Sequence, residues 1–72
     1  MTFQIKSTQI TDRISVQMDI DKCGVYEVYV CETYDPPLAK AYDRKTYGDK
    51  RVAQRRFNYL VARERRDHVD ER

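Results

Sequence analysis

The chain has 72 residues and a formal net charge of +2, and it is 40% hydrophobic and 36% charged. A chain of this length forms one small domain with a thin core, and its apolar and aromatic content excludes a disordered protein. Its first residues contain neither a basic segment followed by an apolar run nor a stretch of about 18 apolar residues. We therefore expect no signal peptide, no membrane span and a cytoplasmic location.

The first two elements are predicted to be a pair of strands. Near the start, Phe3 and Ile5 alternate with Gln4 and Lys6, and the segment ITDR provides a turn. Residues 13–21 then alternate apolar and polar side chains, which is typical of a strand buried on one face. The predicted core face of this second strand consists of Ile14, Val16, Met18 and Ile20.

Residues 25–34 are rich in β-branched and aromatic side chains and predict a third strand. Between the second and third strands lies Lys-Cys-Gly, which fits a three-residue hairpin loop with Gly24 in the left-handed conformation. Such a loop pairs Asp21 with Val25. It places the core face of the second strand opposite the more apolar face of the third: Ile20 with Tyr26, Met18 with Val28, and Val16 with Val30.

Residues 38–47 allow two interpretations, a fourth antiparallel strand or a short helix. The preceding Asp-Pro-Pro, residues 35–37, predicts a loop because proline has no amide donor for a sheet. Alanine and lysine in residues 38–47 favour a helix, whereas tyrosine and threonine favour a strand. We choose the strand.

The last element is predicted to be an amphipathic helix. Thr46 followed three residues later by Asp49 fits a capping arrangement, so the helix is expected to begin near Tyr47 and to reach about Arg66. Its apolar sector lies toward the sheet. That sector consists of Ala53, Phe57, Leu60 and Val61, with Val52 at its edge.

These elements define the fold class: an α+β two-layer sandwich, with an antiparallel β-meander of three to four strands and one C-terminal helix packed on one face. Residues 1–66 form the single domain, and residues 67–72 are a charged tail expected to fray. By order of elements, this arrangement is similar to the small single-stranded-DNA-binding transcription cofactors that dimerise through their helices. The similarity lies in architecture, since no motif of that family matches these residues.

Catalytic chemistry is not indicated. The single histidine, His68, lies in the charged tail, and the two glycines are too far apart for a phosphate-binding loop. Cys23 and Cys31 have no histidine near enough in sequence to complete a zinc site, and they are interpreted as reduced, incidental thiols. We therefore expect no enzymatic activity, metal, cofactor or small-molecule substrate.

The clearest functional signal is an uneven distribution of charge. Residues 1–43 carry a net charge of −3 and residues 44–72 a net charge of +5, and residues 51–66 alone contain six arginines. On a helical wheel these arginines avoid the apolar sector. The candidate anion or nucleic-acid contacts are Arg51, Arg55, Tyr59 and Arg66 on the outward side, with Arg56 and Arg63 on one flank. The alternative is an ordinary solvated helix surface.

The sheet face that one helix leaves uncovered is a second candidate surface, with Lys6, Arg13 and Tyr29 as possible contacts. Two functions follow. The first is a small non-enzymatic cytosolic interaction module whose arginine-rich helix face or open sheet face contacts a protein partner or its own copy. A homodimer is expected because a thin core gains from oligomerisation. The second is an accessory protein that binds single-stranded DNA or RNA through the arginine-rich helix or the open sheet face.

Overall fold

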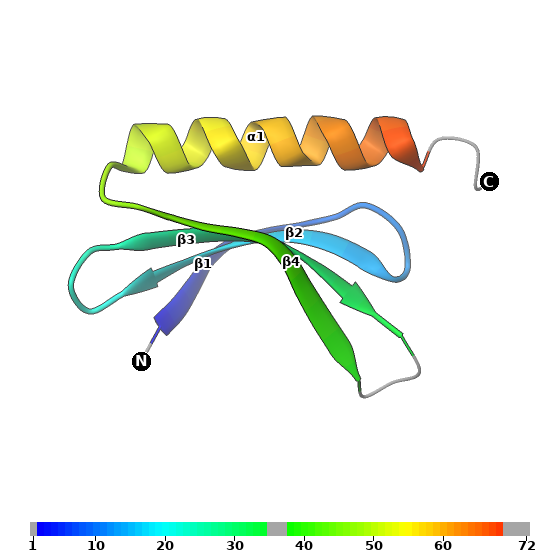
Figure 1. Cartoon of the computed structure of the whole chain (residues 1–72), viewed down its shortest axis with the longest axis horizontal. Coiled ribbons are helices and arrows are strands. Elements are labelled where there is room, and N and C mark those ends of the chain that lie inside the picture. The colour runs from blue at the N-terminus through cyan, green and yellow to red at the C-terminus, as the bar shows by residue number, and fades with distance from the viewer. Residues whose placement is uncertain (1, 35–37, 69–72) are drawn as a thin grey trace.

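The computed structural model describes residues 2–34 and 38–68, and it confirms the predicted α+β fold (Figure 1). Four antiparallel strands form a sheet in the order β1-β2-β3-β4, and one C-terminal helix packs against it. The elements are β1 (Thr2–Gln9), β2 (Ile14–Asp21), β3 (Tyr26–Thr33), β4 (Ala39–Tyr47) and α1 (Lys50–Asp67).

The β2–β3 hairpin has the predicted loop and the predicted register. Gly24 has a φ of 83°, the left-handed conformation that glycine adopts without a steric penalty. The Asp21 amide donates to the Val25 carbonyl at 3.0 Å, and the Asp21 carboxylate accepts from the Val25 amide at 2.9 Å. Ile20 pairs with Tyr26, Met18 with Val28, and Val16 with Val30.

The β1–β2 pairing corrects the predicted faces of β1. The register shifts between Gln4 and Lys6, so that Gln4 pairs with Asp19 but Lys6 pairs with Met18. A bulge of one residue at Ile5 reverses the alternation, because side chains change face at every residue of a regular strand. Lys6 therefore lies on the helix side of the sheet, and its placement on the open face was wrong.

Residues 39–47 form the strand that was chosen over a helix. Its pairing with β3 is also irregular, since Val28 pairs with Lys45 whereas Val30 pairs with Tyr42. Asp43 lies in the irregular segment with a φ of 55°, which fits a bulge. The predicted loop at residues 35–37 lies outside the described residues.

Helix α1 begins three residues later than predicted. Asp49 is the N-cap and accepts a hydrogen bond from the Arg51 amide at 2.8 Å, so Thr46 belongs to β4 instead of to a cap. The helix ends at Asp67, and the His68 amide donates back to the carbonyls of Glu64 and Arg66. Helical structure thus continues one residue past the expected domain boundary, and residues 69–72 of the predicted tail are not described.

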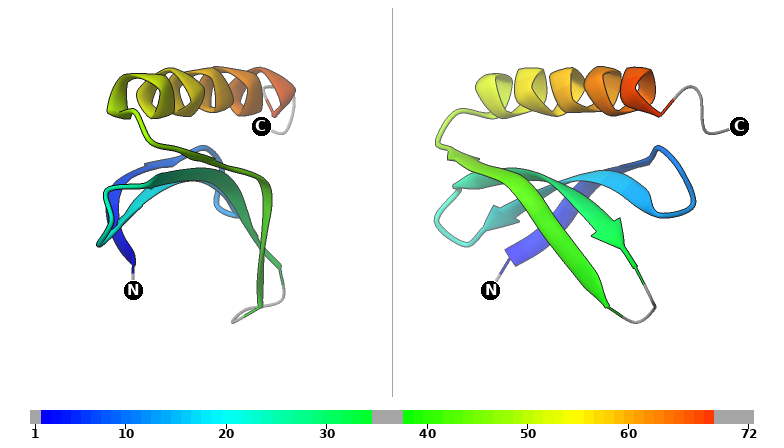
Figure 2. Two further views of the ribbon diagram at one scale, coloured as in Figure 1. Left: turned by 60° about the vertical axis from the view of Figure 1, so that its left-hand side comes forward. Right: turned by 45° about the vertical axis from the view of Figure 1, so that its right-hand side comes forward.

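The core lies between α1 and the middle of the sheet. Its buried apolar residues are Ile14, Val16, Met18, Val28, Val30, Ala53, Phe57 and Leu60. Figure 2 shows that the sheet is arched, with α1 along its convex side and β1 and β4 curving away from the helix. The open face is therefore concave, and Ser15 on that face is only 8% exposed although no helix covers it.

Candidate functional site: the outward face of α1

The outward surface of α1 presents the arginines that the helical wheel predicted. We define the arginine face as Arg51, Arg55, Tyr59 and Arg66, all of which are exposed. The opposite side of the helix carries the buried Ala53, Phe57, Leu60 and Glu64. At 1.5 Å per residue, the arginine face extends about 22 Å along the helix axis.

The charge of the arginine face is not neutralised within the described part of the chain. None of the ion pairs formed by the described residues involves Arg51, Arg55 or Arg66. The two acidic residues of α1 are Glu64, which is buried on the sheet side, and Asp67 at the C-terminal end. Positive charge therefore dominates this surface.

The two flanking arginines have different environments. Arg56 lies over the ring of Tyr59, with its guanidinium carbon 5.2 Å from the ring centroid, and Tyr59 nevertheless remains 52% exposed. Arg63 is bound within the protein, since its guanidinium pairs with Asp43 and with Glu64. These hydrogen bonds, first to Asp43 and then to Glu64, raise the pKa of Arg63. Arg63 is therefore occupied in the fold and is not available to an external anion.

A polar cluster at the C-terminal end of α1 was not predicted from the sequence. Glu64 is only 4% exposed. Its carboxylate accepts hydrogen bonds from Arg63 at 2.8 and 3.0 Å and from the Tyr42 hydroxyl at 3.3 Å, and it lies 3.3 Å from His68 Nε2. Glu64 follows Phe57 by seven residues and Leu60 by four, so its place in the apolar sector was visible in the helical spacing.

Burial and the neighbouring Glu64 carboxylate together raise the pKa of Tyr42 to about 12. Removal of its proton would place a phenolate beside a buried carboxylate. Tyr42 is thus held as a neutral hydrogen-bond donor, and with Asp43 it joins β4 to the end of α1.

The three residues predicted for the open sheet face do not form one surface. Lys6 lies on the helix side, with its Nζ atom 5.1 Å from the centroid of the Phe57 ring. Arg13 is exposed in the β1–β2 turn. Only Tyr29 lies on the concave face, because it pairs with Gln17 in the centre of the sheet.

Tyr29 is already held by its neighbours. Its hydroxyl lies within hydrogen-bond distance of Asp19 Oδ2 at 2.9 Å and Gln17 Oε1 at 3.0 Å. The guanidinium of Arg44 lies 5.3 Å from the ring centroid and pairs with Glu27 at 3.6 Å. Burial, followed by the hydrogen bond to Asp19, raises the pKa of Tyr29 to about 12.

The described residues provide neither a cluster of metal ligands nor a membrane-spanning helix. Within residues 2–34 and 38–68, no group of three His, Cys, Asp or Glu side chains could hold a metal ion. No helix in these ranges is both long and apolar enough to cross a bilayer. Cys23 and Cys31 are both free thiols.

Comparison with protein families, curated proteins and solved structures finds no match to this chain.

Proposed function

We propose that this protein binds single-stranded nucleic acid through the arginine face of α1. The observation that carries the proposal is the row of exposed arginines that have no carboxylate partner among the described residues. Cations that are already paired gain little from a new anion, whereas unpaired guanidinium groups can release counterions from a phosphate backbone.

The chemistry of the face supports this ligand. Guanidinium groups hold phosphate oxygens through two parallel hydrogen bonds, which the point charge of lysine cannot do. Tyr59 is 52% exposed in the same face and provides an aromatic ring on which a base can stack. The helix below is fixed by the buried Phe57 and Leu60, so the face is a rigid surface.

The concave sheet face is a poorer binding surface for a strand. Asp19 and Glu27 add negative charge beside Tyr29, and the Asp19 Oδ1 atom is buried with no hydrogen-bond partner among the described residues. A phosphate there would meet a carboxylate, and the Tyr29 hydroxyl is already within hydrogen-bond distance of Asp19 and Gln17. We therefore place the contact on the helix.

The test measures affinity for a short single strand as salt concentration rises. Contacts from Arg51, Arg55 and Arg66 predict that log affinity falls with log salt with a slope of about −2. The double variant Arg55→Glu/Arg66→Glu should weaken binding at least about tenfold and reduce the slope. A matched control, Arg13→Glu/Lys22→Glu, changes net charge equally at two exposed positions outside α1.

Two results would contradict the proposal. One is the absence of binding to both DNA and RNA strands at low salt. The other is an equal loss of affinity in the control variant, which would indicate an effect of net charge instead of a defined face.

A second candidate function, self-association, is favoured by the exposed strand β1. The helix packs on β2, β3 and β4, while Phe3 and Ile5 on β1 remain 58% and 46% exposed. Strand β1 is also an edge of the sheet, with backbone groups that a second strand can pair. We propose that two copies pair through β1, which would leave both arginine faces free.

Light scattering over a range of concentrations tests this homodimer. Phe3→Lys should shift the population to monomer, because a charged side chain on an edge strand opposes pairing. Leu38→Lys, at a residue that is 52% exposed next to β4, is the control. A wild-type protein that is monomeric at every concentration would refute the dimer without affecting the nucleic-acid proposal.

A further inference from the structure

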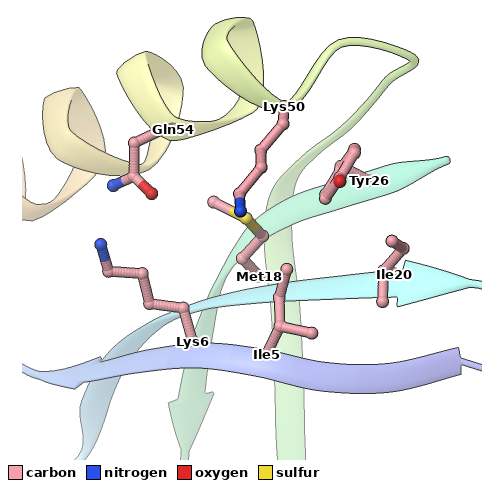
Figure 3. Close-up of a pocket in the computed structure, with 7 residues that line it drawn as sticks. All are labelled: Ile5, Lys6, Met18, Ile20, Tyr26, Lys50 and Gln54. Atoms are coloured by element: carbon pink, nitrogen blue, oxygen red, sulfur yellow. The ribbon is translucent and has the colours of Figure 1, made fainter. Parts of the chain in front are cut away.

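A pocket of about 390 Å³ opens at the seam between the N-terminal end of α1 and strands β1 to β3 (Figure 3). This volume lies within the range of small-molecule sites, about 300–1,000 Å³. The pocket combines an apolar wall with polar groups from both the sheet and the helix. It is lined by Ile5, Lys6, Met18, Ile20, Tyr26, Lys50 and Gln54.

Two ammonium groups enter the pocket from opposite sides. Figure 3 shows Lys6 reaching toward the helix and Lys50 reaching down toward Met18. Neither lysine forms an ion pair with any described carboxylate. Two cations that line one pocket without a carboxylate partner are both available to attract a bound anion.

The position of Lys6 is produced by the bulge at Ile5. In a regular β1 its side chain would point to the concave face, but the register shift turns it beneath α1 against the Phe57 ring. Bulges frequently redirect a side chain at a functional site. The second lysine is supplied by the first residue of α1.

The remaining lining groups indicate what kind of uncharged group the ligand would carry beside its anion. Ile5, Met18, Ile20 and the ring of Tyr26 form the apolar wall. The amide of Gln54 donates from Nε2 to Asn58 Oδ1 at 2.9 Å, which leaves its oxygen free to accept from a ligand. A flat apolar body would replace water on the wall, and an anionic group would lie between the lysines.

We propose that this seam pocket binds a small organic anion: an aromatic ring system that carries one carboxylate or phosphate group. The ring lies against Met18 and Tyr26, and the anion is held by Lys6 and Lys50. The proposal is independent of the arginine face, because the pocket lies on the sheet side of α1.

The test follows methyl NMR signals during titration with 2-naphthoate. Saturable shifts are expected at the methyl groups of Ile5, Met18 and Ile20, and not at Ile14 at the other end of β2. Two matched ligands separate the contributions: neutral 2-naphthamide lacks the charge, and acetate lacks the ring. Each should bind at least about tenfold more weakly. A nucleoside monophosphate forms a third titration, which distinguishes a nucleotide ligand from a simple aromatic acid.

Substitution of the two lysines tests whether they bind the carboxylate of the ligand. Lys6→Met and Lys50→Met should each weaken 2-naphthoate binding by about tenfold, the scale of one lost charge-assisted contact. Lys22→Met, in the exposed β2–β3 turn, should not change it. The proposal is overturned if 2-naphthamide binds as tightly as 2-naphthoate, if the shifts are spread over Ile14 as well, or if Lys22→Met weakens binding equally.

Discussion

The two ends of the seam between α1 and the sheet differ in whether their charged side chains are paired. At the C-terminal end, Arg63 and Glu64 from the helix meet Tyr42 and Asp43 from β4, so that opposite charges are in contact. At the N-terminal end, Lys6 and Lys50 face one pocket with no carboxylate partner in the described chain.

The contrast separates polar residues that stabilise the fold from polar residues that remain available to a ligand. A buried carboxylate without partners is costly, so Glu64 requires its hydrogen bonds for the helix to dock. Lysines at a solvated pocket need no partner, because water screens them. We call the C-terminal end, with its paired charges, the closed end, and the N-terminal end, with its pocket, the open end. Mutations at the closed end should therefore lower the stability of the fold, whereas mutations at the open end should weaken ligand binding.

The largest effect is expected when the closed end loses its cation. Arg63→Met should destabilise the fold by about 2 kcal/mol, somewhat less than for a fully buried pair because the Arg63 side chain is 22% exposed. Adding Glu64→Leu should restore most of this loss, since it removes the unpaired carboxylate. Urea denaturation measures both, with the exposed Arg65→Met as control. Equal stability of Arg63→Met and Arg65→Met would contradict the distinction.

High pH should weaken the same end through Tyr42. Its pKa rises from 10.0 to about 12 in the folded state. A raised pKa means that the folded protein holds the proton more tightly, so its stabilisation is complete below about pH 10 and is lost as the pH rises to about 12. The loss is on the order of 1 kcal/mol after solvent screening. The pKa of Tyr29 is also raised to about 12, so Tyr42→Phe should remove only part of the slope of the stability–pH curve in this range, and Tyr29→Phe/Tyr42→Phe should remove most of it.

At the open end, the helix cap gives an intermediate effect on stability. Asp49→Ala removes the acceptor for the Arg51 amide and should cost about 1 kcal/mol. Asp49→Asn should retain most of that stability, because asparagine is an equally good cap. Thermal unfolding followed by circular dichroism compares the two; an equal loss in both would indicate a role for the charge of Asp49 beyond its hydrogen bond.

The smallest effect is expected for Lys6→Met, within about 0.5 kcal/mol of the wild type. The variant loses the interaction of the ammonium with the Phe57 ring but keeps an apolar side chain against it. The same lysine-to-methionine change that weakens ligand binding should thus leave urea denaturation nearly unaltered. A loss as large as that of Arg63→Met would show that Lys6 has a structural role and would remove the contrast between the two ends.

Local patterns predicted much of this fold. The alternation in residues 13–21 and the Lys-Cys-Gly loop fixed both the β2–β3 register and the core positions Val16, Met18, Val28 and Val30, because the side-chain period of a strand and the geometry of a short hairpin are local properties. Helical spacing likewise identified Phe57 and Leu60 as buried and Arg51 and Arg55 as outward.

Other features depend on contacts between segments that are distant in sequence. Nothing in the β1 sequence marks Ile5 as a bulge, and this single extra residue moves Lys6 from the concave face to the pocket under α1. Similarly, Glu64 follows the apolar spacing but has the wrong polarity for a core. Its burial is made favourable by Arg63 beside it in α1 and by the Tyr42 hydroxyl from β4, and Asp43 of β4 pairs with the same Arg63.

The sequence by itself thus determined the elements, the central register and the outward direction of the arginines, since each follows from the period of one segment. The tertiary structure alone decided which charges are paired between elements. The pair Arg63–Asp43 requires side chains from α1 and β4 to lie within a few ångströms of each other, and that distance is set by bulges, by the arch of the sheet and by the docking of the helix.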